Sequence, residues 1–296
     1  MTHFALTLGR TLLVALLVWP AVSQAQLVSV SDVLIEGKGW ESLADDFTHV
    51  DDLAADRSGH LFISDSAQSK IFRSDPTGKT AVWVAESHGT RGIAVGADGR
   101  LYACESQTGD IVAYDGSGKR TVIAKGIHGD DLLVTALGGL YISQAQDRKL
   151  WYVSPDGARR VVFRGLRQAS GIALWPDGST FILADGDIAY LWTFRVAADG
   201  SLRARQPFST LRTTIDGGGR RPSGVTRMTV DASHHLFATS SEGLQFFDKE
   251  GRLSGVILRP RGVTLSSVVF GGPERQVLYV ASRTTVYRRL TQGAKK

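Results

Sequence analysis

Cysteine is nearly absent from this chain, and that scarcity excludes two kinds of stabilisation. Cys104 is the only cysteine among 296 residues, so no disulfide can form within the chain. Zinc sites built from several cysteines are excluded by the same count. The excess of positive charge is also small, because the chain has 34 Lys and Arg residues against 29 Asp and Glu residues. No basic block alternates with aromatic residues. We therefore expect no nucleic-acid partner.

Long apolar runs are missing except for one near the N-terminus. That run extends from Thr11 to Val22, follows Arg10, and precedes Ser23-Gln24-Ala25, which has small residues at the −3 and −1 positions of a cleavage site. It has about a dozen residues where a membrane span needs roughly twenty. The sequence thus predicts an export signal over residues 1–25 and a mature chain over residues 26–296. We expect a periplasmic or secreted protein with no membrane attachment after cleavage.

A repeat runs through nearly the whole mature chain. Each copy has an apolar run, a turn with Gly or Asp, a second run such as Leu-Tyr-Ile-Ser, and usually two further runs. The spacing between successive starts is nearly constant, except for one longer interval before the fifth copy. The six copies open at Leu53, Ile93, Leu132, Ile172, Met228 and Val268.

These runs have the length and composition of β-strands. They are four to six residues long, rich in Val, Ile, Leu, Phe and Tyr, and bounded by Asp-Gly, Ser-Gly or Pro-Asp-Gly turns. Four strands in a period of roughly 40 residues are typical of a propeller blade. Two stacked β-sandwiches would explain the composition but not the constant register. The sequence therefore predicts an all-β, six-bladed β-propeller over residues 26–296, closed by an outer strand from Leu27–Ile35.

The register predicts where a functional site lies. In a propeller the first strand of each blade lines the central channel, so the residues just before these strands meet at one mouth. One residue before each start the sequence has Asp52, Gly92, Asp131, Gly171, Arg227 and Ser267. Two residues before each start it has Asp51, Arg91, Asp130, Ser170, Thr226 and Ser266. The second strands end at the same mouth with Asp65, Glu105 and Gln144.

Acidic side chains dominate blades 1 to 3 of this predicted ring. Carboxylates held together repel unless they are protonated or bridged by a cation, so oxygen ligands for Ca²⁺, Mg²⁺ or Mn²⁺ are one interpretation. His49 and His128, each two residues before an Asp-Asp pair, extend the choice to Zn²⁺. The other interpretation is structural: Asp caps a turn, and Arg91 and Arg227 neutralise the acids.

Several segments resemble a known family. GIAVGADGRLYACES, DDLLVTALGGLYIS, SGIALWPDG and above all SVVFGGPERQVLYVAS are similar to the family of senescence marker protein, gluconolactonase and luciferin-regenerating enzyme, over about residues 49–290. The resemblance implies a six-bladed propeller that hydrolyses sugar lactones at the channel mouth. It also implies one divalent metal, held by a Glu of blade 1, an Asn of blade 4 and an Asp of blade 5, with an Asn-Asp pair of blade 3 nearby.

The corresponding positions here keep only part of that pattern. Asp51 stands for the Glu, and Asp130-Asp131 stand for the Asn-Asp pair. Ser170 replaces the Asn of blade 4, and Thr226-Arg227 replace an Asp-Gly of blade 5. Two of the three implied ligands are thus hydroxyls, and Arg227 adds a cation that raises the electrostatic cost of a metal.

Two main hypotheses follow. The first is a metal-assisted hydrolase of sugar lactones or related cyclic esters, with the metal on Asp51 and Asp130 and with Asp131 or Asp130 as general base. The second is a non-catalytic propeller that binds a sugar acid or a partner protein. A lyase using His49, His88, His128 and Glu105 is a third possibility. The residues expected to contact the substrate are Arg91, Ser170, Thr226, Arg227 and Glu105.

Overall fold

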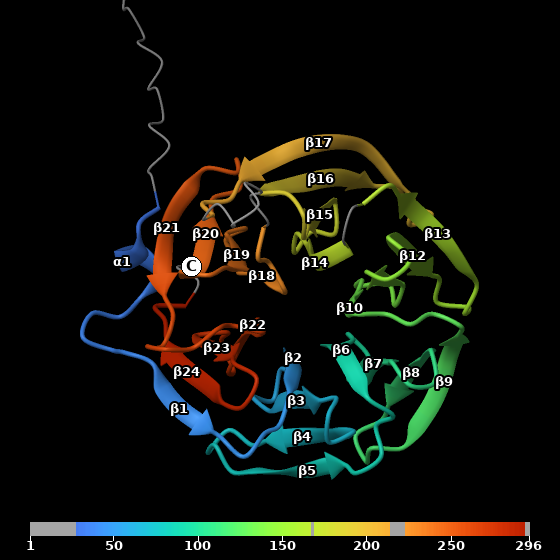
Figure 1. Cartoon of the computed structure of the whole chain (residues 1–296), viewed down its shortest axis with the longest axis horizontal. Helices are drawn as coiled ribbons and strands as arrows, with labels where there is room; N and C mark the ends of the chain where they lie inside the picture. The colour runs from blue at the N-terminus through green and yellow to red at the C-terminus, as the bar shows by residue number, and fades with distance from the viewer. Residues whose placement is uncertain (1–27, 167–168, 214–222, 294–296) are drawn as a thin grey trace, which may run out of the picture.

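The computed structural model describes residues 28–166, 169–213 and 223–293. Nearly all regular structure in these ranges is β-strand, and the strands form six four-stranded antiparallel sheets arranged in a ring (Figure 1). The six-bladed propeller predicted from the repeat is thereby confirmed. No helix in the described part of the chain combines the length and apolar character needed to cross a membrane. The predicted export signal, residues 1–25, lies outside the described residues.

Consecutive strands pair within each blade, and the first strand of each blade is innermost (Figure 1). Blades 1 to 3 comprise β2 (Val50–Ala55), β3 (Leu61–Asp65), β4 (Lys70–Ser74) and β5 (Thr80–Val84); β6 (Thr90–Val95), β7 (Leu101–Glu105), β8 (Asp110–Tyr114) and β9 (Arg120–Lys125); and β10 (Asp131–Val134), β11 (Leu140–Gln144), β12 (Lys149–Val153) and β13 (Arg159–Arg164). Blades 4 to 6 comprise β14 (Ala169–Leu174), β15 (Thr180–Asp185), β16 (Tyr190–Val196) and β17 (Leu202–Thr210); β18 (Met228–Val230), β19 (Leu236–Thr239), β20 (Gly243–Phe247) and β21 (Leu253–Leu258); and β22 (Ser267–Gly271), β23 (Val277–Ala281), β24 (Val286–Leu290) and β1 (Glu41–Ala44).

The ring closes with a strand from the N-terminal segment, but not with the strand that was predicted. β1 pairs antiparallel with β24 as the outermost strand of blade 6, with Glu41 opposite Arg288. The prediction that Leu27–Ile35 forms this strand is wrong, because Val30–Val33 form the short helix α1. The Asp32 carboxylate accepts the backbone N–H of Ser29, at 2.9 Å, which favours the start of a helical turn. α1 packs beside β21, outside the ring (Figure 1).

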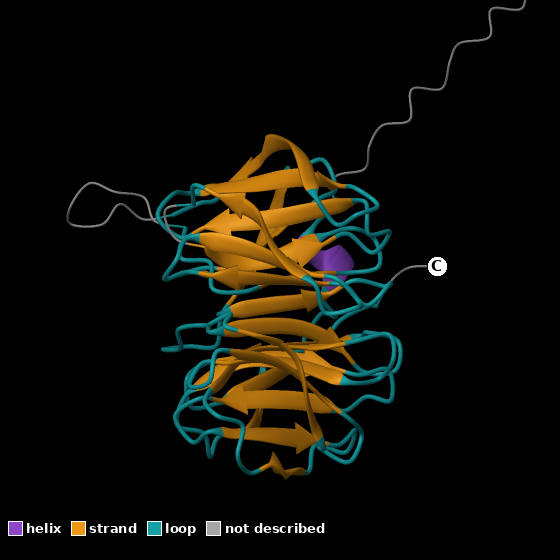
Figure 2. Ribbon diagram, turned by 90° about the vertical axis from the view of Figure 1, so that its right-hand side faces the viewer, coloured by secondary structure: helices purple, strands orange, loops and turns teal. Residues whose placement is uncertain are grey.

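The core consists of apolar layers between neighbouring blades. Each buried cluster draws its side chains from two adjacent sheets, so every blade buries its faces against its neighbours. Between blades 5 and 6, the Phe237 ring packs 5.5 Å from Phe246 and 4.9 Å from Phe270, centroid to centroid. Loops and turns gather on the two sides of the ring when it is seen edge-on (Figure 2). One of these two sides carries the starts of the innermost strands.

Repeated turn sequences have a repeated hydrogen-bond pattern. In the turn between β4 and β5, the Asp75 Oδ1 atom accepts the backbone N–H groups of Thr77 and Lys79, and Gly78 has φ +95°. The Asp115 turn between β8 and β9 repeats this arrangement. An aspartate that satisfies turn N–H groups and a glycine that accepts a positive φ explain why Asp-x-(Thr/Ser)-Gly recurs at hairpins.

The inter-blade layers make a testable prediction. Phe237→Ala removes a fully buried ring that contacts two blades, and we expect it to lower the free energy of unfolding by about 3–5 kcal/mol. Leu137→Ala is the control, because Leu137 is 85% exposed in a hairpin turn, and we expect a change within about 0.5 kcal/mol. Urea unfolding followed by fluorescence measures both. Equal losses in the two variants would contradict the proposed location of the core.

Candidate active site

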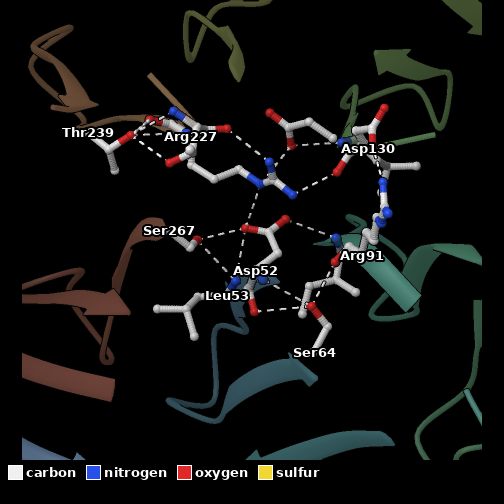
Figure 3. Close-up of polar contacts among 12 residues, drawn as sticks. Asp52, Leu53, Ser64, Arg91, Asp130, Arg227, Thr239 and Ser267 are labelled. Carbon is white, nitrogen blue, oxygen red and sulfur yellow. Dashed lines mark hydrogen bonds and ion pairs between the residues drawn. The ribbon is translucent and has the colours of Figure 1, made fainter. Parts of the chain in front are cut away.

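Side chains from blades 1, 3, 5 and 6 meet where the innermost strands begin. Arg227, directly before β18, reaches across so that its Nε lies 3.0 Å from Asp52 Oδ1 and 3.4 Å from Asp131 Oδ1. The Ser267 hydroxyl donates to the same Asp52 oxygen, at 2.7 Å. Figure 3 shows the Arg227 side chain extending toward Asp52 and the backbone at Asp130. Residues separated by as many as 215 positions therefore form one cluster.

Asp52 and Asp131 have matching roles two blades apart. The Asp52 Oδ2 atom accepts the backbone N–H of Ile93 in blade 2, and the Asp131 Oδ2 atom accepts that of Ile172 in blade 4, both at 3.0 Å. Each carboxylate also accepts the N–H of the residue that follows it. Both aspartates are only 4% exposed. They therefore tie one blade to the next while carrying a charge that the protein must neutralise.

The two glycines of this row lie close to the backbone of the next blade. A Cβ atom at Gly92 would lie 2.9 Å from the Asp131 Cα and 3.0 Å from the Asp130 carbonyl oxygen. A Cβ atom at Gly171 would lie 3.2 Å from the Arg227 carbonyl carbon. The distance of 2.9 Å is closer than real Cβ atoms come to backbone and the distance of 3.2 Å is tighter than most, so glycine at these two positions allows the innermost strands to pack together at the mouth.

Burial dominates the electrostatics of this cluster. It raises the pKa of the Asp131 carboxyl to about 7; the Asp52 charge adds to the rise, while Arg227 and the N–H groups of Ile172 and Leu132 oppose it. Burial also disfavours the charged form of Arg227, but the two carboxylates outweigh it and raise the pKa of the guanidinium above its ordinary value. Arg227 is therefore a permanent cation.

A second ion pair lies in the more exposed row. Arg91 Nη1 is 2.5 Å from Asp130 Oδ1, with the two side chains 47% and 25% exposed. The other Asp130 oxygen accepts the backbone N–H of Ala145, at 2.8 Å. Arg227 Nη2 donates to the Asp130 carbonyl oxygen, at 2.7 Å. Asp130 thus joins the solvent-facing pair to the buried cluster beneath it.

Asp51, Ser170 and Thr226, also in the exposed row, bond within their own blades. Asp51 Oδ2 accepts the N–H of Ser66, at 3.1 Å, just after β3. The Ser170 hydroxyl donates to the Ala184 carbonyl in β15, at 2.9 Å. The Thr226 hydroxyl is 2.9 Å from that of Thr239 in β19. The hydrogen bonds of the structure therefore do not link these three side chains to one another.

The structure does not bring Glu105 into the cluster. Its carboxylate is fully buried inside blade 2, where Arg120 of β9 binds both oxygens at 2.8 and 2.7 Å. The hydroxyls of Tyr114 and Thr108 donate to it as well. Because these partners satisfy the carboxylate from the outer strands, Glu105 holds blade 2 together and does not face the mouth.

The divalent metal implied by the resemblance does not fit these residues. The hydroxyls of Ser170 and Thr226 are hydrogen-bonded within their own blades, and the Arg227 guanidinium lies against the buried carboxylates. Among the described residues no group of three or more His, Cys, Asp or Glu side chains is arranged to hold a metal. Calcium needs six to eight oxygen ligands, and a cation this close would be repelled by Arg227. We derive no step through a metal.

Two contributors to the cluster were missed by the sequence reasoning. The Ser64 hydroxyl donates to the Arg91 carbonyl, at 2.7 Å, and accepts the Asp52 N–H, at 3.0 Å. The Thr239 hydroxyl accepts the N–H groups of Thr226 and Arg227. Both residues lie eleven positions after the start of a repeat copy. This is one residue before the position predicted as the end of the second strand. A small polar residue recurring at that position was the available signal.

A family profile matches most of the chain. The profile described as the SMP-30/gluconolactonase/LRE-like region matches residues 52–284. A gluconolactonase from Zymomonas mobilis is 25% identical over 69% of this chain, and the match spans 64% of that protein. Lactonase drp35 from Staphylococcus epidermidis is 25% identical over 81% of this chain and 77% of its own length.

Similarity to solved structures extends over the whole ring. A gluconolactonase from Xanthomonas campestris superposes with a TM-score of 0.75 at 21% identity, covering 88% of this chain and 92% of that one. At this identity the superposition supports the propeller fold and not a shared site.

The buried Glu105 pair predicts a pH-dependent stability. Burial raises the pKa of Glu105, but hydrogen bonds from Arg120, Thr108 and Tyr114 outweigh it and hold that pKa below its ordinary 4.5. The ionised pair therefore stabilises the fold fully above pH 4.5, and this stabilisation is lost as the pH falls through the lowered pKa. We expect Glu105→Gln to cost about 3 kcal/mol at pH 7 and progressively less below pH 4.5.

The control for this prediction is Glu250→Gln. Glu250 is paired with Arg252 at 3.2 Å, but both side chains are about half exposed, so the variant should cost less than about 1 kcal/mol. Chemical unfolding across the pH range measures both variants. A Glu105→Gln deficit that stays constant down to low pH would contradict the assigned role of the ionised pair.

Proposed function

This chain belongs to the SMP-30/gluconolactonase/LRE-like family, and from that membership we propose that it hydrolyses a lactone or related cyclic ester at the mouth of its channel. The similarity to proteins named gluconolactonase and lactonase supports the reaction class. The substrate proposed is a small sugar lactone, with the corresponding sugar acid as product. The Arg91–Asp130 pair carries the proposal, because it combines a cation and a base at an exposed position of the ring.

Asp130 is the carboxylate best placed to act as general base. It is one-quarter exposed, whereas Asp131 is buried and surrounded by donors from the protein. Among the described residues, each Asp130 oxygen accepts one hydrogen bond, and a carboxylate oxygen can accept a second. A water molecule can therefore donate to Asp130 without breaking the contacts that orient it. Asp131 is then a positioning residue that holds the backbone beneath Asp130.

Arg91 complements this base with a cationic hydrogen-bond donor. One of its guanidinium nitrogens binds Asp130, and within the described residues its other donors make no hydrogen bond, so they can face a substrate carbonyl. Asp130 takes a proton from water, the water oxygen bonds to the lactone carbonyl carbon, and the developing oxyanion is stabilised by Arg91. The ring C–O bond then breaks, and the ring oxygen takes up the proton held by Asp130. The net reaction adds one water to one lactone.

Hydroxyls beside this pair suit a polyhydroxylated substrate. The carbonyl oxygens of Thr226 and Asp130 accept hydrogen bonds from two nitrogens of the same Arg227 guanidinium, so these residues lie close together. Thr226 is exposed and Ser170 is partly buried, and each hydroxyl can make a further hydrogen bond. We propose that both contact the hydroxyls of the sugar.

A ligand-binding propeller without turnover is the second candidate. Ser170 and Thr226 replace two metal ligands implied by the family, which favours a binding role over the chemistry of the relatives. In that case Arg91 would bind the carboxylate of a sugar acid. The two candidates separate in one assay, because only the first consumes lactone.

The first test is the loss of hydrolysis in two variants. Glucono-δ-lactone and a panel of uncharged lactones are followed by acid release in a pH-stat, corrected for spontaneous hydrolysis. We expect Asp130→Asn and Arg91→Met each to lower kcat/KM by at least about 100-fold, because one removes the base and the other the oxyanion partner.

A similar ion pair on the other side of the ring supplies the control. Arg100 and Asp98, 2.6 Å apart and about 40% exposed, lie in the turn after β6. Arg100→Met and Asp98→Asn should leave kcat/KM unchanged. No lactone hydrolysis above the spontaneous rate by the unaltered protein would refute the enzyme proposal, and gluconate binding in that case would support the second candidate.

We further propose that residues 1–25 direct export and are removed. The apolar run after Arg10 and the Ser23-Gln24-Ala25 site support cleavage after Ala25. When the full chain is produced in a Gram-negative host, we expect the periplasmic protein to begin at Gln26, as measured by intact mass. Ala25→Arg should block processing. Protein that still carries residues 1–25 and is found in the cytosolic fraction would contradict export.

A further inference from the structure

We propose that the Arg227 guanidinium is the resident cation of this channel, occupying a set of oxygen ligands that a divalent ion would otherwise require. The proposal depends on the proposed function only for the assumption that the reaction takes place at this mouth. It assigns Arg227 a positioning role: it neutralises the buried carboxylates and holds the Asp130 backbone from below.

Four oxygen atoms converge on the guanidinium. Two are carboxylate oxygens, Asp52 Oδ1 at 3.0 Å and Asp131 Oδ1 at 3.4 Å from Nε. Two are carbonyl oxygens, of Thr226 at 2.9 Å from Nη1 and of Asp130 at 2.7 Å from Nη2. Carboxylate and carbonyl oxygens around one positive charge are also the ligand chemistry of calcium sites. Here an organic cation, fixed covalently to blade 5, takes that place.

The arrangement neutralises charge without a diffusible ion. Asp52 and Asp131 are both 4% exposed, and two carboxylates buried together would repel. The Arg227 side chain is 12% exposed and contacts both carboxylates. Because the cation belongs to the chain, it cannot be lost to a chelator. The same guanidinium bridges blades 1, 3 and 5 and binds the carbonyl of the residue proposed as base.

Removing the guanidinium should therefore create metal affinity. Arg227→Ala leaves both carboxylate oxygens and both carbonyl oxygens facing vacated space, where water molecules can complete the six or more oxygen ligands that a hard divalent ion takes. Arg227→Met fills most of that space with an uncharged chain of comparable length and serves as the matched control. Arg227→Lys keeps a single positive charge. Only the alanine variant combines excess negative charge with room for an ion.

Thermal unfolding with and without metal tests the proposal. The unaltered protein should keep its Tm in the presence of chelator and also in about 5 mM Ca²⁺ or Mn²⁺. That concentration exceeds the dissociation constants of even weak calcium sites. Arg227→Ala and Arg227→Met should each lose on the order of 10 °C, because buried carboxylates are left without a cation. Either ion should restore at least half of the loss in Arg227→Ala, and neither should restore Arg227→Met. Arg227→Lys should not respond to either ion.

Two results would overturn the proposal. The first is stoichiometric Ca²⁺ or Mn²⁺ binding by the unaltered protein in calorimetry, abolished by Asp52→Asn. The second is a folded Arg227→Ala variant whose Tm is indifferent to both ions. If Arg227→Ala does not fold, the Arg227→Met/Asp131→Asn double variant decides. It should unfold at a higher temperature than Arg227→Met, because one unpaired carboxylate is gone, and no recovery would refute the proposal. None of these measurements uses a lactone, so a failure of the proposed hydrolysis would be recognised separately.

Discussion

Each sheet of this protein has two apolar faces, and it can cover both only by packing between two other sheets. Phe237 illustrates the constraint, since its ring contacts Phe246 of its own blade and Phe270 of the next. A row of such sheets has exposed ends until it closes into a ring, so closure is a condition of burying the core. Closure in turn brings the starts of the innermost strands together. The cluster around Arg227 is a product of that requirement.

The repeat was sufficient to predict the fold, because a nearly constant period with three or four short apolar runs in each copy has few structural solutions. The closing strand was placed wrongly because the apolar alternation of Leu27–Ile35 concealed a helical start at Ser29 and Asp32. Glu41–Ala44, which does close the ring, has only four residues, and only two of them are apolar. Pairing with a strand far away in the sequence leaves little trace in local composition.

The sequence predicted at which end of the channel the candidate site lies, but not which way each side chain points. Register placed Asp52, Asp131, Arg227 and Ser267 at one level, and the structure brings them into contact. The same reasoning assigned Glu105 to the mouth, although its carboxylate points to Arg120 on the outermost strand of blade 2. Repeat alignment contains no information about which face a strand-end side chain occupies, or about a partner on a later strand. Pairing of buried charges depends on tertiary packing.

The mouth has two layers with different physical characters. The lower layer is deeply buried, and its ion pairs and hydrogen bonds join blades 1 to 6. The upper layer, represented by Arg91 and Asp130, is partly open to solvent, and the contacts among the described residues leave donors of Arg91 and acceptor capacity of Asp130 unused. Asp130 belongs to both, through its side chain above and its carbonyl below. Family membership describes the scaffold, whereas the chemistry available at the mouth depends on these particular side chains.

The pairing of β1 with β24 has a consequence for how the molecule is made. Glu41 lies opposite Arg288, so the last sheet cannot be completed until the chain has been synthesised through β24. Until then, the flanks of the first and sixth blades remain uncovered, and contacts of such long sequence separation form slowly. A chain that stopped before β24 would have no partner for β1 and would lack the seam that joins the sixth blade to the N-terminal strand.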